Sequence, residues 1–335
     1  MKKSIGNIFM ILMISAFFVI IGLSGCLKKE SPIPFPTGTF PDSVFNLAGI
    51  NSTFDDYNLD IHQINGSYSF IFSSNRGSSG GQFDLVQGVI SIAFSQTTGE
   101  FGVNSEMGND AFLTKLINKA NTTGNDFGPM TLYSSVDGYE YLLLSSVNIA
   151  GNLDFYYFKN RPVYGTNLPD ILGPFPIKLL NTIADDAYIS FDSNQDSVYF
   201  SSNSGGNFDI FLQKKSSETA IDTWFNLNYS ASTSVDSINS SYEDKCPLIY
   251  KKVMVFASNR PGGMGGYDLY YSIFRKGKWS APTNFGSRIN TSSDEYRPII
   301  GYHPGFTNQF MMFSSNRPGG KGGFDLYFTG VEFPK

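Results

Sequence analysis

Histidine, cysteine and tryptophan are scarce in this chain of 335 residues, with two of each. The two histidines, His62 and His303, lie far apart in the sequence, and Cys246 is the one cysteine outside the N-terminal segment. So few ligands and nucleophiles form neither a metal cluster nor a nucleophile triad. A lone thiol also has no partner for an internal disulfide. We therefore expect no cofactor and no bound metal.

Charged residues are also few, at 16% of the chain, and acidic residues are in excess. The 24 basic and 29 acidic residues give a formal net charge of −5. A surface of this sign does not attract nucleic acid or anionic lipid through bulk charge. No nucleic-acid partner is therefore expected.

A hairpin motif is repeated five times. In its fullest form, at residues 313–328, apolar and aromatic residues flank the turn Asn-Arg-Pro-Gly-Gly, a pattern typical of two β-strands joined by a glycine-rich loop. The other copies begin at residues 72, 144, 200 and 256. The aspartates that follow the turns are Asp84, Asp154, Asp209, Asp268 and Asp325. Their spacing of 55 to 70 residues indicates a repeat protein.

A second signature precedes every hairpin: an asparagine is followed five positions later by an acid. The pairs are Asn51 and Asp56, Asn121 and Asp126, Asn181 and Asp186, Asn239 and Asp244, and Asn290 and Glu295. A constant short offset within a variable long period indicates a structural unit with loops of varying length. Each unit offers four short strands, which predicts a propeller blade. The sequence thus predicts an all-β, five-bladed β-propeller of four-stranded antiparallel blades over residues 37–335.

The two ends of the predicted propeller complement each other. The fifth copy stops after its third strand, and Phe40 lies 11 residues before Asn51, as Trp279 lies 11 before Asn290. We therefore expect the N-terminal segment to be the fourth strand of the last blade. Such pairing closes the ring and removes an exposed edge.

Residues 87–119 lengthen the first unit. Within them Phe112, Leu113, Leu116 and Ile117 have the spacing of a short amphipathic helix. A distorted outer strand fits the same residues, and we favour a decorated loop.

Residues 1–26 are expected to direct the protein to its location in the cell rather than to form part of the fold. Lys2 and Lys3 precede an apolar stretch at 8–23, and Leu-Ser-Gly-Cys follows at 23–26. This resembles the lipobox of bacterial lipoproteins, which implies cleavage before Cys26 and lipidation of its thiol. A plain transmembrane anchor is the alternative. We predict a signal peptide at 1–25 and a lipidated, proline-rich tether at 26–36.

The same resemblance bears on location. The residue after Cys26 is not the aspartate that retains lipoproteins in the inner membrane. The expected location is therefore the cell envelope, with lipid anchoring to the outer membrane. Whether the protein faces the periplasm or the surface stays open.

Three stretches, 279–282, 289–298 and 313–327, are similar to the WD40-like β-propeller repeat. That repeat occurs in the periplasmic propeller protein of the Tol system and in envelope proteins of Bacteroidota that join it to OmpA-like domains. The resemblance implies a propeller in an envelope setting. Because no OmpA-like region accompanies the repeats, it does not imply peptidoglycan binding.

The hairpin aspartates are expected to accept hydrogen bonds from their turns, because a catalytic group is rarely needed five times. Calcium binding is the sharper alternative, although each turn offers few carboxylates. The glycine runs do not predict a phosphate cradle, since a strand rather than a helix follows them.

The acids of the second signature open the strands that should lie innermost. They are Asp56, Asp126, Asp186, Asp244 and Glu295. One interpretation is that each caps a strand with its asparagine. The other is an acidic ring at one mouth of the central channel, binding a cation, a sugar or a basic partner.

Two functions remain. We favour a lipid-anchored, non-catalytic protein-binding or assembly scaffold with an envelope protein partner. Its candidate contacts lie in loops at one face and at the channel mouth, and are Arg76, Arg260, Arg317 and exposed aromatic residues. The alternative is a polysaccharide-binding or glycoside-hydrolysing propeller. Glycoside hydrolysis needs two or three carboxylates in different roles, and here they recur so symmetrically that none stands out as catalytic.

Overall fold

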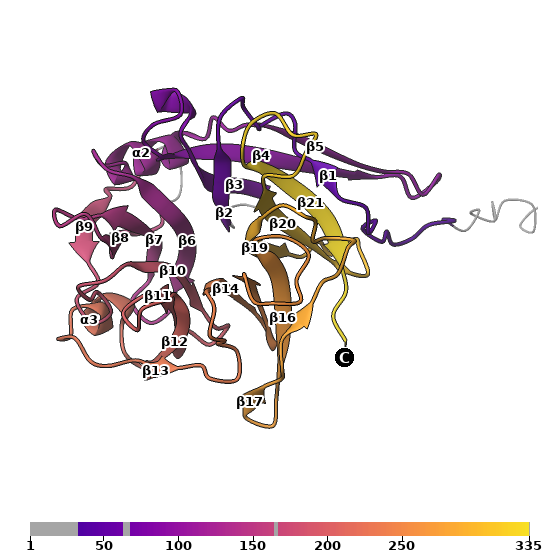
Figure 1. Ribbon diagram of the computed structural model, residues 1–335. Coiled ribbons are helices and arrows are strands. Elements are labelled where there is room, and N and C mark those ends of the chain that lie inside the picture. The colour runs from indigo at the N-terminus through magenta and orange to yellow at the C-terminus, as the bar shows by residue number, and fades with distance from the viewer. Residues whose placement is uncertain (1–32, 63–67, 164–166, 335) are drawn as a thin grey trace, which may run out of the picture.

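The computed structural model describes residues 33–62, 68–163 and 167–334. These residues form five antiparallel sheets around one axis (Figure 1). The predicted all-β, five-bladed propeller with four-stranded blades is confirmed. The predicted signal peptide, Cys26 and the tether up to residue 32 lie outside the described residues.

Each blade begins with its innermost strand. Blade 1 contains β2 (Asp56–His62), β3 (Tyr68–Ser74), β4 (Asp84–Phe94) and β5 (Phe101–Met107). Blade 2 contains β6 (Asp126–Ser134), β7 (Tyr139–Val147), β8 (Leu153–Asn160) and β9 (Leu172–Pro176). Blade 3 contains β10 (Asp186–Phe191), β11 (Ser197–Ser202), β12 (Asp209–Lys214) and β13 (Thr233–Ser234).

The outer strand of blade 4 is split in two. This blade contains β14 (Asp244–Tyr250), β15 (Val253–Ser258), β16 (Asp268–Arg275), β17 (Lys278–Trp279) and β18 (Thr283–Asn284). Blade 5 contains β19 (Glu295–Gly301), β20 (Gln309–Ser315), β21 (Asp325–Val331) and β1 (Phe45–Asn46). In β1, Phe45 lies opposite Phe328 and Asn46 opposite Tyr327, so the N-terminal segment supplies the outer strand of the last blade.

The inner strands surround the axis in Figure 1, and each contacts the next, including β19 and β2. Five apolar clusters lie between neighbouring blades, one at each of the five junctions. Phe155 and Phe200 pack together between blades 2 and 3, and Phe72 and Phe310 belong to the cluster between blades 5 and 1. A single blade therefore cannot bury its apolar faces alone, and the ring folds as one body.

Residues 87–119 contain both an outer strand and a helix. The strand is β5, and the helix is α2 (Ala111–Ala120), which begins where the Asp110 side chain accepts a hydrogen bond from the Leu113 N–H at 2.8 Å. Leu113, Leu116 and Ile117 are buried between blades 1 and 2. The chain also has a short helix α3 (Ile221–Phe225) and a 3₁₀ turn η1 (Arg76–Ser78). No helix within the described ranges has the length and apolarity needed to cross a bilayer.

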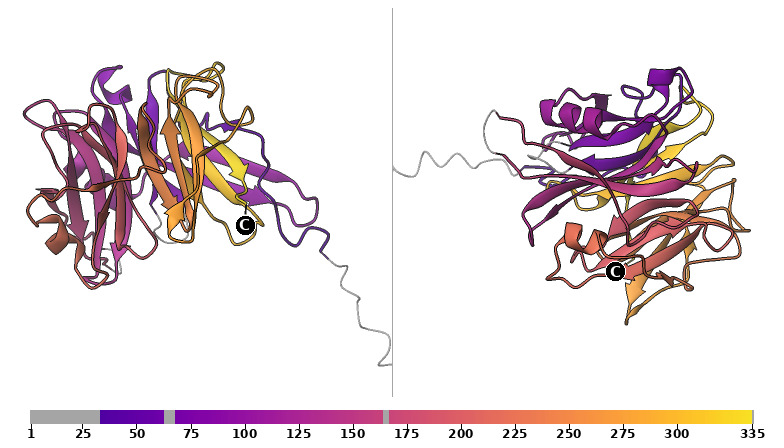
Figure 2. Two further views of the ribbon diagram at one scale, coloured as in Figure 1. Left: turned by 60° about the horizontal axis from the view of Figure 1, so that its bottom comes forward. Right: turned by 90° about the vertical axis from the view of Figure 1, so that its left-hand side faces the viewer.

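The ring has two faces. One, called the hairpin face here, carries the starts of the inner strands and the turns between second and third strands at 75–83, 148–152, 203–208, 259–267 and 316–324. The N-terminal segment runs along the other face, where the Gly38 N–H donates to Gly305 O and the Phe40 N–H to Asn308 Oδ1, both at 2.8 Å. Figure 2 shows this segment at the opposite end of blade 5 from the turn at 316–324.

Candidate functional site

The repeated asparagines join each blade to the one before it. In every copy the Asn side chain accepts from the backbone N–H, and donates to the C=O, of the residue after a hairpin aspartate, at 2.7–3.1 Å. Asn51, for example, bridges to Leu326 of blade 5. The asparagine signature therefore fixes how neighbouring blades pack.

The acids five positions later are buried, with no exposed side-chain surface in any copy. Each accepts a hydrogen bond from the backbone N–H of the residue after its asparagine, at 2.5–2.8 Å. Asp56 also accepts from the Ser74 hydroxyl at 2.5 Å, and Glu295 from Ser315 at 2.9 Å. These carboxylates hold the entry of each inner strand and form no open acidic rim at the channel mouth.

Three of the five acids are paired with arginine. Arg76 binds Asp56 at 2.5 Å, Arg317 binds Glu295 at 3.0 Å, and Arg260 binds Asp244. Each guanidinium also donates to a backbone carbonyl of the segment before the blade, at 2.6–2.7 Å. The charges of these three arginines are thus already paired inside the fold.

Blades 2 and 3 lack this pair, because Asn148 and Ser204 stand where the other blades have arginine. Burial raises the pKa of Asp126 and of Asp186 to about 6, although hydrogen bonds from Thr122 and Thr182 oppose the shift. One oxygen of Asp186 has no hydrogen-bond partner. These two carboxylates are the electrostatically least satisfied of the five.

The hairpin aspartates hold their turns most tightly in blades 4 and 5. Asp268 accepts from the backbone N–H groups of Met264 and Gly265, at 2.7 and 3.0 Å, and from Asn284 at 2.7 Å. Asp325 is held in the equivalent way, accepting from the backbone N–H groups of Lys321 and Gly322 and from the Asn46 side chain. In the other blades, Asp84 accepts from Gln82 at 2.9 Å, Asp209 accepts weakly from Asn207 at 3.4 Å, and one oxygen of Asp154 is buried without a partner.

A continuous band of partly exposed aromatic rings lies around the channel mouth on the hairpin face. It consists of Phe127, Phe83, Tyr57, Phe324, Tyr296, Tyr267 and Phe208, and is called the aromatic band here. From Phe127 to Tyr267, successive rings lie 4.9–6.3 Å apart between centroids. The Lys245 ammonium lies 5.2 Å from the Tyr267 ring and 4.3 Å from the Phe208 ring, and so joins Phe208 to the band.

The positions of these rings are fixed by bonds between blades. The Phe324 N–H donates to Asp55 and the Tyr267 N–H to Asp294, both at 2.8 Å. The Phe83 N–H donates to Asn125 at 2.9 Å. In these three cases the ring of one blade is held by an acid or amide side chain that lies just before the first strand of the next blade. These hydrogen bonds make the band a rigid surface.

One carboxylate stands out beside the band. Glu243 forms an ion pair with Lys245 at 2.5 Å and accepts a hydrogen bond from the Tyr267 hydroxyl. Burial acts to raise the pKa of Glu243, but the hydrogen bonds from Lys245 and Tyr267 outweigh it and leave this pKa below its usual value. Glu243 is therefore an ionised, half-buried carboxylate among aromatic rings.

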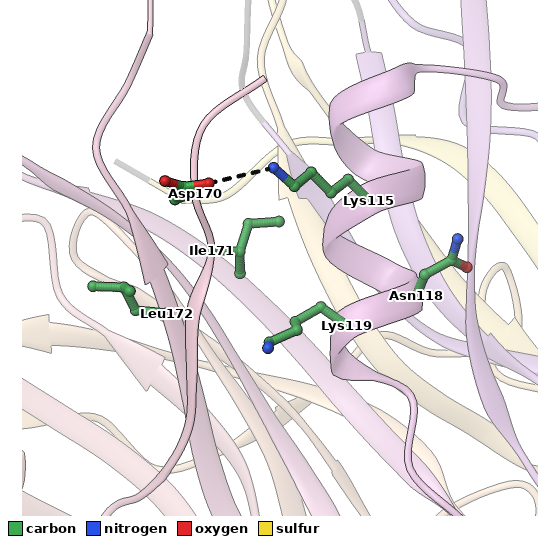
Figure 3. Close-up of a pocket in the computed structure, with 6 residues that line it drawn as sticks. All are labelled: Lys115, Asn118, Lys119, Asp170, Ile171 and Leu172. Atoms are coloured by element: carbon green, nitrogen blue, oxygen red, sulfur yellow. Dashed lines mark ion pairs between the residues drawn. The ribbon is translucent and has the colours of Figure 1, made fainter. Parts of the chain in front are cut away.

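A hollow of about 560 Å³ lies away from the band, between α2 and the segment that precedes β9 (Figure 3). It is lined by Lys115, Asn118, Lys119, Asp170, Ile171 and Leu172. Lys115 spans it, donating to Pro169 O at 2.6 Å and lying 3.9 Å from Asp170. The described part of the chain contains no cluster of three His, Cys, Asp or Glu side chains suited to a metal ion.

Reasoning from sequence expected exposed aromatic residues as contacts at the channel mouth but did not identify the residues of the aromatic band. Its signal is nevertheless present, because the residue before the hairpin aspartate is aromatic in four of the five copies: Phe83, Phe208, Tyr267 and Phe324. The remaining rings, Tyr57, Phe127 and Tyr296, directly follow the acid that begins an inner strand. Only the fold shows that these two positions of the repeat meet at the channel mouth.

Comparison with known proteins gives a fold relationship. No family model matches the chain. A search of curated proteins also gave no match. Among solved structures, the chain is similar to a thermostable family-43 glycoside hydrolase, with 12% identity, a TM-score of 0.52 and coverage of 88% of this chain and 94% of the other.

Two further solved structures are also similar. An endo-arabinase from Bacteroides thetaiotaomicron has 11% identity and a TM-score of 0.52, covering 89% of this chain and 98% of the other. An exo-1,5-α-L-arabinanase from a bovine ruminal metagenomic library has 11% identity and a TM-score of 0.50, covering 84% and 94%. At such identities the likeness establishes the five-bladed fold.

These findings correct three predictions. Assignment to the WD40-like repeat family is wrong, since the similar solved structures reported above are glycoside hydrolases and no family model matches. The predictions of a protein-binding scaffold and of a non-enzyme are wrong for the same reason. The motifs behind the resemblance serve turn geometry and blade packing, which any propeller with short glycine-rich hairpins requires.

Proposed function

We propose that this protein is a carbohydrate-active propeller that binds a polysaccharide across the aromatic band and cleaves its glycosidic bonds. The observation that carries the proposal is the band itself, a rigid aromatic surface with an ionised carboxylate at the mouth of the channel. The glycoside hydrolases that share the fold support it.

The band suits a sugar chain because pyranose and furanose rings present apolar C–H faces with hydroxyl groups at their edges. Aromatic faces cover the apolar part, and a few fixed polar groups orient the hydroxyls. Here Lys245 and Glu243 are the polar groups held among the rings. A neutral, hydroxyl-rich polymer is therefore the ligand class that this surface fits best.

Cleavage requires one ionised carboxylate and a second group that donates a proton to the leaving oxygen. Glu243 is the candidate for the ionised role, because Lys245 and Tyr267 keep its pKa low. Asp55, Asp185 and Asp294 occupy the corresponding entry position in other blades and are half-buried. They are the candidates for the group that donates a proton to the leaving oxygen.

A lipid anchor at Cys26 remains part of the proposal. The described end of the tether lies beside the hairpin between β4 and β5, where the Phe35 N–H donates to Gln96 O at 3.0 Å. This is the face opposite the aromatic band. An anchor there would hold the protein on a membrane with the band turned toward the surrounding polysaccharide.

The first test is binding. The full-length chain, purified in detergent, is run on native gels with and without arabinan, the polymer implied by the names of two structural neighbours. Retardation is expected, and Phe208→Ala should weaken binding by at least about fivefold, since a buried aromatic contact is worth more than about 1 kcal/mol. Tyr302→Ala is the control, because Tyr302 is an exposed ring on the opposite face.

The second test is cleavage, measured as new reducing ends from arabinan, galactan and xylan. Glu243→Gln should lower the rate by about 100-fold or more while leaving retardation in the gel, since it removes charge rather than an aromatic ring. If the wild-type chain neither binds nor cleaves any of these polymers, the proposed function is wrong.

A further inference from the structure

Beneath the aromatic band, the channel is lined by the third residue of each inner strand. These residues are Asn58, Gly128, Tyr188, Cys246 and Arg297, and all have a positive φ of 43–60°. The strand register shifts at the same point in every blade, so each position is a bulge. Contacts between blades that are not neighbours show that these side chains reach across the axis. Tyr188 of blade 3, for example, lies 6.4 Å from Tyr296 of blade 5.

Arg297 is the one charged residue of this set. It is 1% exposed and crosses from blade 5 to blade 2, where Nη2 donates to Pro129 O at 2.9 Å. Its Nε and Nη1 atoms have no hydrogen-bond partner. Within the described residues, no carboxylate lies within ion-pair distance of this guanidinium, in contrast to Arg76, Arg260 and Arg317.

Asn58 occupies the same position in the adjoining blade 1. It is completely buried, and neither its side-chain nitrogen nor its oxygen has a hydrogen-bond partner. Two neighbouring bulges thus bring unpaired N–H groups, one set of them positively charged, into the same buried channel. Leaving such buried groups without a partner destabilises the fold, more for a charge than for an amide.

Arg297 acts to lower the pKa of Asp60, but the Asp60 carboxylate is hydrogen-bonded to Thr131 rather than to Arg297. Its Oδ2 atom accepts from the Thr131 N–H and hydroxyl, at 2.8 and 2.7 Å. Burial raises the pKa of Asp60 to about 6, against the opposing effects of Thr131 and Arg297. Asp60 therefore loses its charge in mildly acidic solution.

We propose that the channel holds a small monovalent inorganic anion, of the size of chloride or bromide, between the guanidinium of Arg297 and the amide of Asn58. The anion satisfies the unpaired N–H groups and balances the buried positive charge. By doing so it fixes Arg297, which links blades 5 and 2 directly beneath the aromatic band. The site is separate from the proposed polysaccharide surface.

The test is the melting temperature of the full-length chain in sodium bromide, compared with sodium gluconate at equal ionic strength. We expect a rise of roughly 4 °C as bromide goes from its dissociation constant to 100 times that value, and a further rise with the logarithm of the bromide concentration. Arg297→Met should abolish the rise. Arg260→Met is the matched control, because it removes a buried arginine that already has a carboxylate partner, and it should retain the rise.

The bromide effect should also be larger at pH 5 than at pH 7, because Asp60 then no longer competes as a negative charge. The other titratable groups at the channel, Tyr57, Tyr188, Tyr296 and Cys246, stay neutral over this range, since burial raises the pKa of each. A rise of equal size in the wild-type chain and Arg297→Met would overturn the proposal.

Anomalous diffraction from crystals soaked in bromide gives a readout that does not depend on a variant folding. A peak within hydrogen-bond distance of Arg297 Nε or Nη1 is expected. Ordered water alone at that place would overturn the proposal. Neither result depends on polysaccharide binding, so the anion site and the proposed function can fail separately.

Discussion

Blades 1, 4 and 5 differ from blades 2 and 3 in how they stabilise the same buried carboxylate. In the first group an arginine from the hairpin turn neutralises the acid that opens the inner strand. In the second group no arginine is present, and burial raises the pKa of Asp126 and Asp186 to about 6. Backbone and hydroxyl hydrogen bonds alone hold these two acids.

All five blades therefore share one hydrogen bond, in which the backbone N–H of the residue after the asparagine donates to the buried acid. The arginine is an addition that opposes the electrostatic cost of burial in three of them, although burial still raises the pKa of Glu295 beside Arg317. A propeller of this kind tolerates the loss of the ion pair where the acid can take up a proton instead.

The largest expected effect is the loss of an arginine from a paired blade. Arg260→Met should lower the free energy of unfolding by about 3–5 kcal/mol, because Asp244 is left buried and charged without its partner. Chemical denaturation followed by tryptophan fluorescence measures the change. Ser204→Ala, at the same place in blade 3, should change it by no more than about 0.5 kcal/mol.

A second substitution tests the cause of that loss. Adding Asp244→Asn to Arg260→Met removes the unpaired charge and should restore more than about 1 kcal/mol. If the double variant is no more stable than Arg260→Met, the loss came from packing rather than from charge.

The next effect is the pH dependence of the unpaired blades. The folded state binds the proton of Asp186 more tightly than the unfolded state does, since its pKa rises from 3.8 to about 6. The contribution of Asp186 to stability is therefore full below pH ~4 and falls by about 3 kcal/mol as the pH rises through about 6. Relative to wild type, Asp186→Asn should become more stable over that interval.

Asp222 is the control of opposite sign. Burial acts to raise its pKa, but the ion pair with Lys159 outweighs burial and leaves the pKa below its usual value. Asp222 therefore stabilises the fold above its unfolded pKa, and that contribution is lost as the pH falls. Unfolding curves at several pH values should thus give opposite slopes for Asp186→Asn and Asp222→Asn, and equal slopes would contradict the electrostatic interpretation.

The sequence was sufficient to predict the propeller because each repeat carries its own turn and packing signals. Asn51 and its counterparts mark every junction, and Gly319 and Gly320 mark a hairpin that few other residues could form. Register and blade number follow from such local features.

The site could not be predicted in the same way. The sequence leaves open whether Glu295 and its counterparts cap their strands or form an acidic ring. Only the assembled ring of blades shows that all five are buried and that three of them pair with arginine. Tyr57 and Phe324 are 267 residues apart in sequence but their rings lie 5.4 Å apart in the aromatic band, because the first and last blades are neighbours in the ring. A surface assembled from every blade is visible only after the blades are placed.

The smallest expected effect comes from the hairpin glycines, which extend the same comparison to the turns. A Cβ atom on Gly320 of blade 5 would lie 2.0 Å from Asp325 Oδ2, so Gly320→Ala should cost about 1–3 kcal/mol by displacing that carboxylate from the turn. A Cβ atom on Gly205 of blade 3 would meet nothing within 4 Å. Gly205→Ala should therefore change the free energy of unfolding by about 0.5 kcal/mol or less, in either direction. Equal losses in denaturant unfolding would mean that the aspartate does not hold the blade 5 turn.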